Sequence, residues 1–328
     1  MNTLPTRNDM KKRSLVTFTL LLAALSSTMA QMQSAVLMPA GGTTTVEKLP
    51  SAVLDLTNWK LNIPVADANG YSKEIVQPDL NDYADDNFHV NASGDAVVFR
   101  AHANGATTKD SSYPRSELRE MQNNGKDKAS WSIASGGGTH TMQITQAVTH
   151  LPTQKRHVVV GQIHDADDDV IVFRLENKKL FIDHNGKDGP VLTSDYQLGT
   201  KFTVKFVAGG GAVRCYYNGT FVESYPSTAT GCYFKAGMYT QSKPTEKGGR
   251  ENAEDAEAYG EAEVYQLTVT HDYAHDPTDD TPTALVPLPA PRPASSAMFN
   301  LQGIPLHQSP RGIVIQNGRK VLRARLNP

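Results

Sequence analysis

Basic, aromatic and hydrogen-bonding side chains recur at every second position in three separate segments of the sequence. Because alternate residues of a β-strand point to the same side, each segment predicts one polar face. The segment YPRSELRE predicts a face with Arg115, Glu117 and Arg119, opposite Ser116 and Leu118. A sheet that pairs the three segments would present a basic groove, which suits an anionic, hydroxyl-rich polymer.

The other two segments complete this groove. HVVVGQIH predicts a common face for Val158, Val160, Gln162 and His164, opposite Val159 and Ile163. CYFKAGMYTQ predicts a common face for Tyr233, Lys235, Gly237, Tyr239 and Gln241, opposite the core residues Phe234, Ala236 and Met238. For any one segment alone, a solvated sheet face is the ordinary alternative.

Strand-like runs that could position these faces extend from about residue 53 to residue 270, separated by turn residues. No convincing helix interrupts them, and Asn185-Gly186 and Asn218-Gly219 fit hairpin turns that need a positive φ. The pattern predicts an all-β fold, a sandwich of two antiparallel sheets.

The composition is that of a globular protein, with 39% hydrophobic and 20% charged residues in a chain of 328. Its net charge of −2 argues against a basic protein that binds nucleic acid. The basic groove therefore contrasts with the charge of the chain around it.

The N-terminus has the pattern of a cleaved secretory signal peptide over residues 1–30. Three basic residues at 11–13 precede an apolar run over 15–25, and Thr28 and Ala30 supply small residues before the cleavage point. The run is shorter than the roughly 20 residues that a membrane span needs. We expect a secreted or cell-surface protein without a membrane span after signal cleavage.

The C-terminus predicts a Pro-rich linker over 273–296 and a small strand-turn-strand unit over 297–328. In this unit, FNLQG and GIVIQNGRKV resemble motifs of the C-terminal sorting domain of the bacterial type IX secretion system. The resemblance implies a bacterial protein with the type IX machinery as a partner. A small carbohydrate-binding or dimerising appendage is the alternative.

The two cysteines, Cys215 and Cys232, lie 17 residues apart on strand candidates of a chain expected to be exported. We expect them to form a disulfide, worth roughly 3 kcal/mol for a loop of that size. Two free buried thiols are the alternative.

The three polar segments also carry a resemblance. R-S-E-L-R at 115–119, Q-I-H at 162–164 and Y-F-K-A-G-x-Y-x-Q at 233–241 resemble, in this order, the three motifs of the alginate lyases of polysaccharide lyase family 7. DLTNWKLNIPV at 55–65 resembles the start of that domain. The resemblance implies a β-jelly roll with a concave substrate cleft, preceded by a linker over 31–50. The catalytic domain, over 51–272, would cleave alginate by β-elimination without a cofactor.

The chemistry of this elimination needs the residue types of the groove. The carboxylate of a 4-linked uronate must be neutralised, its C5 proton removed and the departing 4-oxygen protonated. Arg115 and Gln162 can hold the carboxylate, and His164 can complete that site or take the proton. Tyr239 can protonate the leaving oxygen, and the cations Arg115 and Lys235 would favour its phenolate. The remaining polar-face residues, predicted to bind substrate, are Glu117, Arg119, Tyr233, Lys235 and Gln241.

The resemblance also implies a division of roles by substrate. Tyr239 would serve as both base and acid on mannuronate, and His164 would be the base on guluronate. The Q-I-H variant of the second motif goes with guluronate-containing blocks.

Three other interpretations compete with the lyase. A glycan-binding module would need the groove but no reacting pair. A glycoside hydrolase would need two carboxylates about 5 to 9 Å apart, whereas the predicted face offers only Glu117. A calcium loop at Asp165, Asp167 and Asp169 would need a glycine where Val170 stands.

Overall fold

The computed structural model describes residues 48–244, 254–255 and 257–277. In the C-terminal tail it describes the backbone of four short strands between residues 298 and 323. The predicted signal peptide, nearly all of the linker over 31–50 and most of the linker over 273–296 lie outside the described residues.

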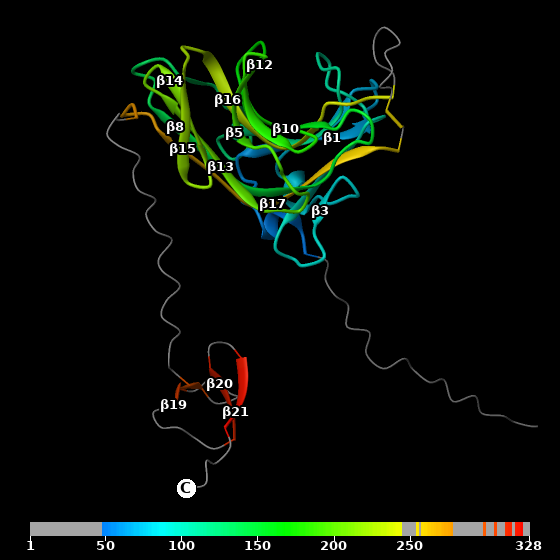
Figure 1. The fold of residues 1–328 in the computed structure, drawn as a ribbon, viewed down its shortest axis with the longest axis vertical. Coiled ribbons are helices and arrows are strands. Elements are labelled where there is room, and N and C mark those ends of the chain that lie inside the picture. The colour runs from blue at the N-terminus through cyan, green and yellow to red at the C-terminus, as the bar shows by residue number, and fades with distance from the viewer. Residues whose placement is uncertain are drawn as a thin grey trace, which may run out of the picture. The chain divides into compact units, whose positions relative to one another are not determined.

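Two antiparallel sheets stacked face to face form the body of the protein (Figure 1). The first, here called the cleft sheet, has the order β12 (Lys187–Thr193), β11 (Lys179–His184), β10 (Asp169–Glu176), β9 (His157–His164), β16 (Thr230–Thr240), β5 (Arg115–Gln122), β1 (Trp59–Ala66) and β2 (Ser72–Ile75). The short strands β6 (Asp127–Lys128) and β7 (Trp131–Ser132) pair with β5 and β16. This arrangement confirms the predicted all-β sandwich.

The second sheet, here called the back sheet, covers the inner face of the first. Its order is β15 (Thr220–Pro226), β14 (Ala212–Tyr217), β13 (Phe202–Gly209), β8 (Thr139–His150), β17 (Tyr259–Asp272), β4 (Val97–His102) and β3 (Phe88–Val90). Two short 3₁₀ helices, η1 (Pro50–Ala52) and η2 (Asp79–Asp82), complete the body. No helix among the described residues is long and apolar enough to cross a membrane.

The core lies between the two sheets. Phe173 of β10 stacks on Phe206 of β13, with ring centroids 4.4 Å apart. On β16, the alternate residues Phe234, Ala236 and Met238 are fully buried, as the sequence pattern predicts. The opposite faces of β16 and its neighbours are therefore free to carry polar side chains.

Strand β9 departs from strict alternation at Gly161. This glycine has a φ of +125°, and the pairing of β9 with both neighbours shifts beside it. Val158 and Val160 consequently belong to the core. The prediction that these valines share a face with Gln162 is wrong, because a β-bulge reverses the side to which later side chains point.

The two cysteines do not form the predicted disulfide. Both are free and fully buried, Cys215 on β14 of the back sheet and Cys232 on β16 of the cleft sheet. These strands do not pair with each other. Burial raises the pKa of the Cys232 thiol to about 12, so it remains protonated and packs as a small apolar group in the core.

The tail forms a separate four-stranded antiparallel sheet. Its order is β19 (Pro305–Leu306), β18 (Met298–Phe299), β20 (Gly312–Gln316) and β21 (Arg319–Arg323). The strand-turn-strand pattern predicted for 297–328 therefore corresponds to strands in this sheet.

Candidate active site

A cleft of about 940 Å³ opens on the outer face of the cleft sheet. It is lined by Arg115, Arg119, Gln162, His164, Tyr233, Lys235 and Tyr239, all from the three polar segments. An adjoining pocket of about 340 Å³ is shared by Gln162, Tyr239 and Gln241. Of the predicted site residues, only Glu117 and the cysteines contribute to neither space.

Strand register brings the three segments together, with β16 between β9 and β5. Lys235 lies opposite Gln162 on one side and Arg119 on the other. Tyr239 lies opposite Arg115. Residues distant in the sequence are thus placed side by side by backbone pairing alone.

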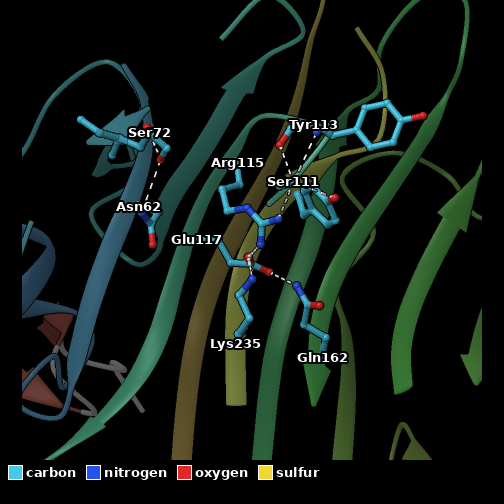
Figure 2. Close-up of polar contacts among 10 residues, drawn as sticks. Asn62, Ser72, Ser111, Tyr113, Arg115, Glu117, Gln162 and Lys235 are labelled. Carbon is cyan, nitrogen blue, oxygen red and sulfur yellow. Dashed lines mark hydrogen bonds and ion pairs between the residues drawn. The ribbon is translucent and has the colours of Figure 1, made fainter. Parts of the chain in front are cut away.

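Glu117 lies beneath the cleft floor, where its side chain has no exposed surface. Its carboxylate binds Arg115 Nη1 at 2.7 Å and Lys235 Nζ at 2.8 Å, and it accepts a hydrogen bond from Gln162 Nε2. Figure 2 shows Glu117 between these three partners. A side chain without exposed surface does not make the predicted contact with substrate; the carboxylate instead holds Arg115, Lys235 and Gln162 in place.

The cations around Glu117 outnumber it. Arg115 and Lys235 are both buried and share this one carboxylate. Arg115 Nε is buried and has no hydrogen-bond partner among the described residues. A buried donor without an acceptor is costly, and two cations that share one carboxylate leave the floor of the cleft with a net positive charge.

Lys235 makes this charge dependent on pH. Burial and neighbouring Arg115 lower its pKa to about 8, although Glu117 opposes the shift. Lys235 is charged below that pKa and neutral above it.

We therefore expect kcat/KM to fall as the pH rises through about 8, mainly through a higher KM. Tyr239 titrates above its ordinary value of 10, so the two groups are separable in a pH profile of initial rates. A flat KM between pH 7 and 9.5 would contradict a role for the Lys235 charge in binding.

Tyr239 presents its hydroxyl beside Ser111. The Ser111 Oγ lies 3.1 Å from the phenol oxygen and accepts a hydrogen bond from Arg115 Nη2 at 3.0 Å. The Arg115 guanidinium lies over the Tyr239 ring, 4.0 Å from its centroid. Burial raises the pKa of Tyr239 more than Arg115 and Ser111 lower it. The expected phenolate is therefore not the resting form, and the protonated phenol is poised as an acid.

His164 has the complementary state. Its Nδ1 donates to the carbonyl of Asp165 at 2.8 Å, which leaves Nε2 as the acceptor. Burial is the main cause that lowers the pKa of His164, so the ring is neutral near pH 7. It stacks on Tyr233, and Arg119 lies over the Tyr233 ring at 4.0 Å. A neutral imidazole can take a proton.

Several cleft residues escaped the sequence analysis. Ser111 and Tyr113 line the cleft in the loop before β5 (Figure 2). Their positions, 111 and 113, extend the every-second-residue spacing of Arg115, Glu117 and Arg119 toward the N-terminus. This spacing could have identified them from the sequence. Lys60 and Asn62 of β1 also line the cleft, and Lys60 pairs with Glu74.

The acidic run ends in β10: residues 165–168 form the tight turn between β9 and β10, and Asp169 begins β10. Asp165 accepts hydrogen bonds from the backbone of Asp167 and Asp168. Among the described residues, no group of three or more His, Cys, Asp or Glu side chains is arranged to hold a metal ion. A hairpin turn differs from the helix-flanked loop of the calcium alternative.

Comparison with known proteins identifies this arrangement. A family model described as alginate lyase matches residues 54–271. A curated alginate lyase of Klebsiella pneumoniae is 31% identical over 156 residues, which cover 40% of this chain and half of that protein. Alginate lyase AlgAT5 from polysaccharide lyase family 7 is 56% identical, with a TM-score of 0.64, covering 69% of this chain and 99% of the solved one.

A third comparison concerns a ligand. A variant of the family 7 alginate lyase A1-II′, solved in complex with the substrate GGMG, is 27% identical with a TM-score of 0.58. It covers 70% of this chain and 99% of the solved one. These likenesses confirm the jelly-roll fold that the motifs implied.

Proposed function

The chain belongs to the alginate lyase family, and from this premise we propose that it cleaves alginate, a 4-linked uronate polymer, by β-elimination. The observation that carries the proposal is the floor of the cleft, where Arg115 and Lys235 share the single carboxylate of Glu117, in a cleft that His164 and Tyr239 also line. A uronate carboxylate matches this site in charge and in hydrogen-bonding geometry.

The proposed reaction uses the neutral imidazole of His164 as the base and the protonated phenol of Tyr239 as the acid. With the substrate carboxylate held by Arg115 and Gln162, Nε2 of His164 takes the C5 proton. The C5–H electrons form the C4–C5 double bond as the bond from C4 to the glycosidic oxygen breaks. Tyr239 gives its proton to that departing oxygen. The products are a saturated end and an unsaturated uronate, whose conjugated double bond absorbs in the ultraviolet.

We expect guluronate-containing blocks to be cleaved faster than pure polymannuronate. His164 and Tyr239 flank the Gln162–Lys235 pair from opposite ends of the β9–β16 pairing. Base and acid on opposite sides of a sugar suit an anti elimination, which guluronate requires.

Ultraviolet rates on purified block fractions test both levels of the proposal. A clear preference for polymannuronate would refute the block preference alone. Release of saturated sugars without ultraviolet absorbance would replace the lyase with a hydrolase, and binding without cleavage would leave a glycan-binding module. Efficient cleavage of a neutral β-glucan would refute the electrostatic account of the cleft.

We further propose that the protein is exported and that its tail acts as a sorting domain. The support is the signal-like N-terminus and the tail motifs. The chain remains attached to the body slightly beyond 272, because Asp276 accepts hydrogen bonds from the backbone of Gly136 and Gly138 at 2.7 and 3.0 Å.

Ending the chain after residue 280 should therefore leave alginate cleavage within about twofold of the full chain, while the truncated protein fails to reach the cell surface of its native host. Fractionation of the host with an activity assay on each fraction measures both. Normal surface delivery of the truncated chain would refute the sorting role.

A further inference from the structure

A second cluster of polar side chains lies beside Tyr239, outside the three sequence motifs. Tyr113 packs edge-on against Tyr239, with ring centroids 6.3 Å apart. Lys155 Nζ donates to the Tyr113 hydroxyl at 2.7 Å and lies 4.8 Å from the centroid of that ring. Lys243 Nζ lies 5.2 Å from the same centroid. Tyr113 lines the cleft, so one aromatic ring of the cleft wall has two ammonium groups beside it.

Glu254 holds this cluster in place. Its side chain is buried, with 4% of the residue exposed. The carboxylate accepts hydrogen bonds from the backbone of Thr153, Gln154 and Lys155, each at 2.9 to 3.0 Å, and from Ser242 Oγ at 2.9 Å. A carboxylate satisfied by this many donors is ionised and rigid, and the hydrogen bonds outweigh burial and lower its pKa.

The same residue ties down both lysines. The Lys155 amide donates to the Glu254 carboxylate, and the Glu254 amide donates to the Lys243 carbonyl at 3.1 Å. One buried residue, through its side chain and its backbone amide, therefore fixes two segments that are distant in sequence, and each segment carries one ammonium group to Tyr113.

We propose that Tyr113, Lys155 and Lys243 form a further subsite, which binds the carboxylate of a neighbouring uronate and stacks its ring, and that Glu254 is the positioning residue of this subsite. The inference rests on the proposed function. Arg115, in the floor of the cleft, would bind the carboxylate of the reacting uronate. The two lysines beside Tyr113 would bind the carboxylate of the next uronate along the polymer. In a polyanion, adjacent sugars offer such charges in succession.

The test removes the charges and retains the packing. In the double variant Lys155→Met/Lys243→Met we expect KM for polymeric alginate to rise about tenfold, with kcat within twofold of wild type. The increase should shrink for uronate oligomers too short to reach the two lysines. It should also shrink at high salt, because salt screens exposed charges.

Lys205→Met is the matched control. Lys205, on β13 of the back sheet, lies 4.1 Å from the centroid of the Tyr216 ring, so it repeats the lysine–tyrosine contact away from the cleft. It should leave KM unchanged. An equal rise in this control, or an unchanged KM in the double variant, would overturn the subsite.

Glu254→Gln tests the positioning role. One oxygen that accepts hydrogen bonds is replaced by an amide donor facing other donors, so the loop should shift. We expect KM to rise with the same dependence on salt and oligomer length as in the double lysine variant. A fall in melting temperature with an equal loss of kcat/KM on every substrate length would show a merely structural residue instead.

Calorimetric binding of uronate oligomers separates this inference from the proposed function. Measured with the lysine substitutions added to Tyr239→Phe, it gives the affinity for the oligomers without their cleavage. Weaker binding on removal of the lysines supports the subsite even if the wild type fails to cleave alginate. Unchanged binding overturns the subsite even if cleavage is normal.

Discussion

Replacing Tyr239 with phenylalanine should lower the turnover of alginate by roughly 100-fold or more, because it removes the proposed proton donor for the departing oxygen. The fold should be unaffected. Among the described residues, the hydroxyl forms a hydrogen bond with Ser111 alone, and the ring under the Arg115 guanidinium remains. The rate of ultraviolet product formation measures the loss, and circular dichroism with thermal melting checks the fold.

Tyr216→Phe is the control for this substitution. Tyr216 is a half-buried tyrosine on β14 of the back sheet, outside the cleft. Loss of its hydroxyl should leave the rate unchanged. Near wild-type turnover in Tyr239→Phe, with substrate affinity preserved, would remove Tyr239 from the reaction and leave another group as the acid.

Substitution of Glu117 by glutamine should destabilise the protein by about 3 to 5 kcal/mol. Glu117 is the shared partner of Arg115 and Lys235, and both would remain buried without its charge. Activity should also fall strongly, since the groups proposed to hold the substrate carboxylate would lose their support. Urea unfolding measures the free energy of unfolding. The rate of alginate cleavage is measured at low temperature, where the variant is still folded.

The matched control is Glu223→Gln on the exposed strand β15, which should change the free energy of unfolding by less than about 0.5 kcal/mol. A similarly small change for Glu117→Gln would mean that Arg115 and Lys235 do not depend on the carboxylate. A stable variant with full activity would contradict the central place given to this residue.

Unbroken alternation along a strand predicts correctly which side chains lie in the core and which line the cleft. On β16, a period of two correctly separates Phe234 and Met238 from Lys235 and Tyr239. On β9 it fails at Gly161, because a bulge depends on the neighbouring strands and leaves only a glycine as its local sign.

The depth at which a side chain is buried could not be predicted from the alternation either. Arg115, Glu117 and Arg119 share a face, yet Glu117 is covered by partners that come from β9 and β16. Cross-strand pairs of this kind depend on register, which a single sequence does not contain. The cysteines have a spacing compatible with a disulfide, but the side chains that meet between two facing sheets depend on how the sheets pack, which spacing does not contain.

The contacts of residues in loops were the hardest to predict from the sequence. Lys155, which donates to Tyr113, lies in a segment whose backbone is bound by Glu254, about a hundred positions later in the sequence. No periodic pattern predicts a hydrogen bond between segments that form no regular element.

The position of β16 between β9 and β5 has a consequence for the order in which the chain can fold. β5 and β9 precede β16 in the sequence, so during synthesis both are made while the edges that will flank β16 have no partner. Unpaired edges of this kind attract other chains, and closing a sheet through such distant segments is slow. Catalytic competence must therefore arrive late, with the insertion of the final cleft strand, and until then the growing chain passes through a stage prone to aggregation.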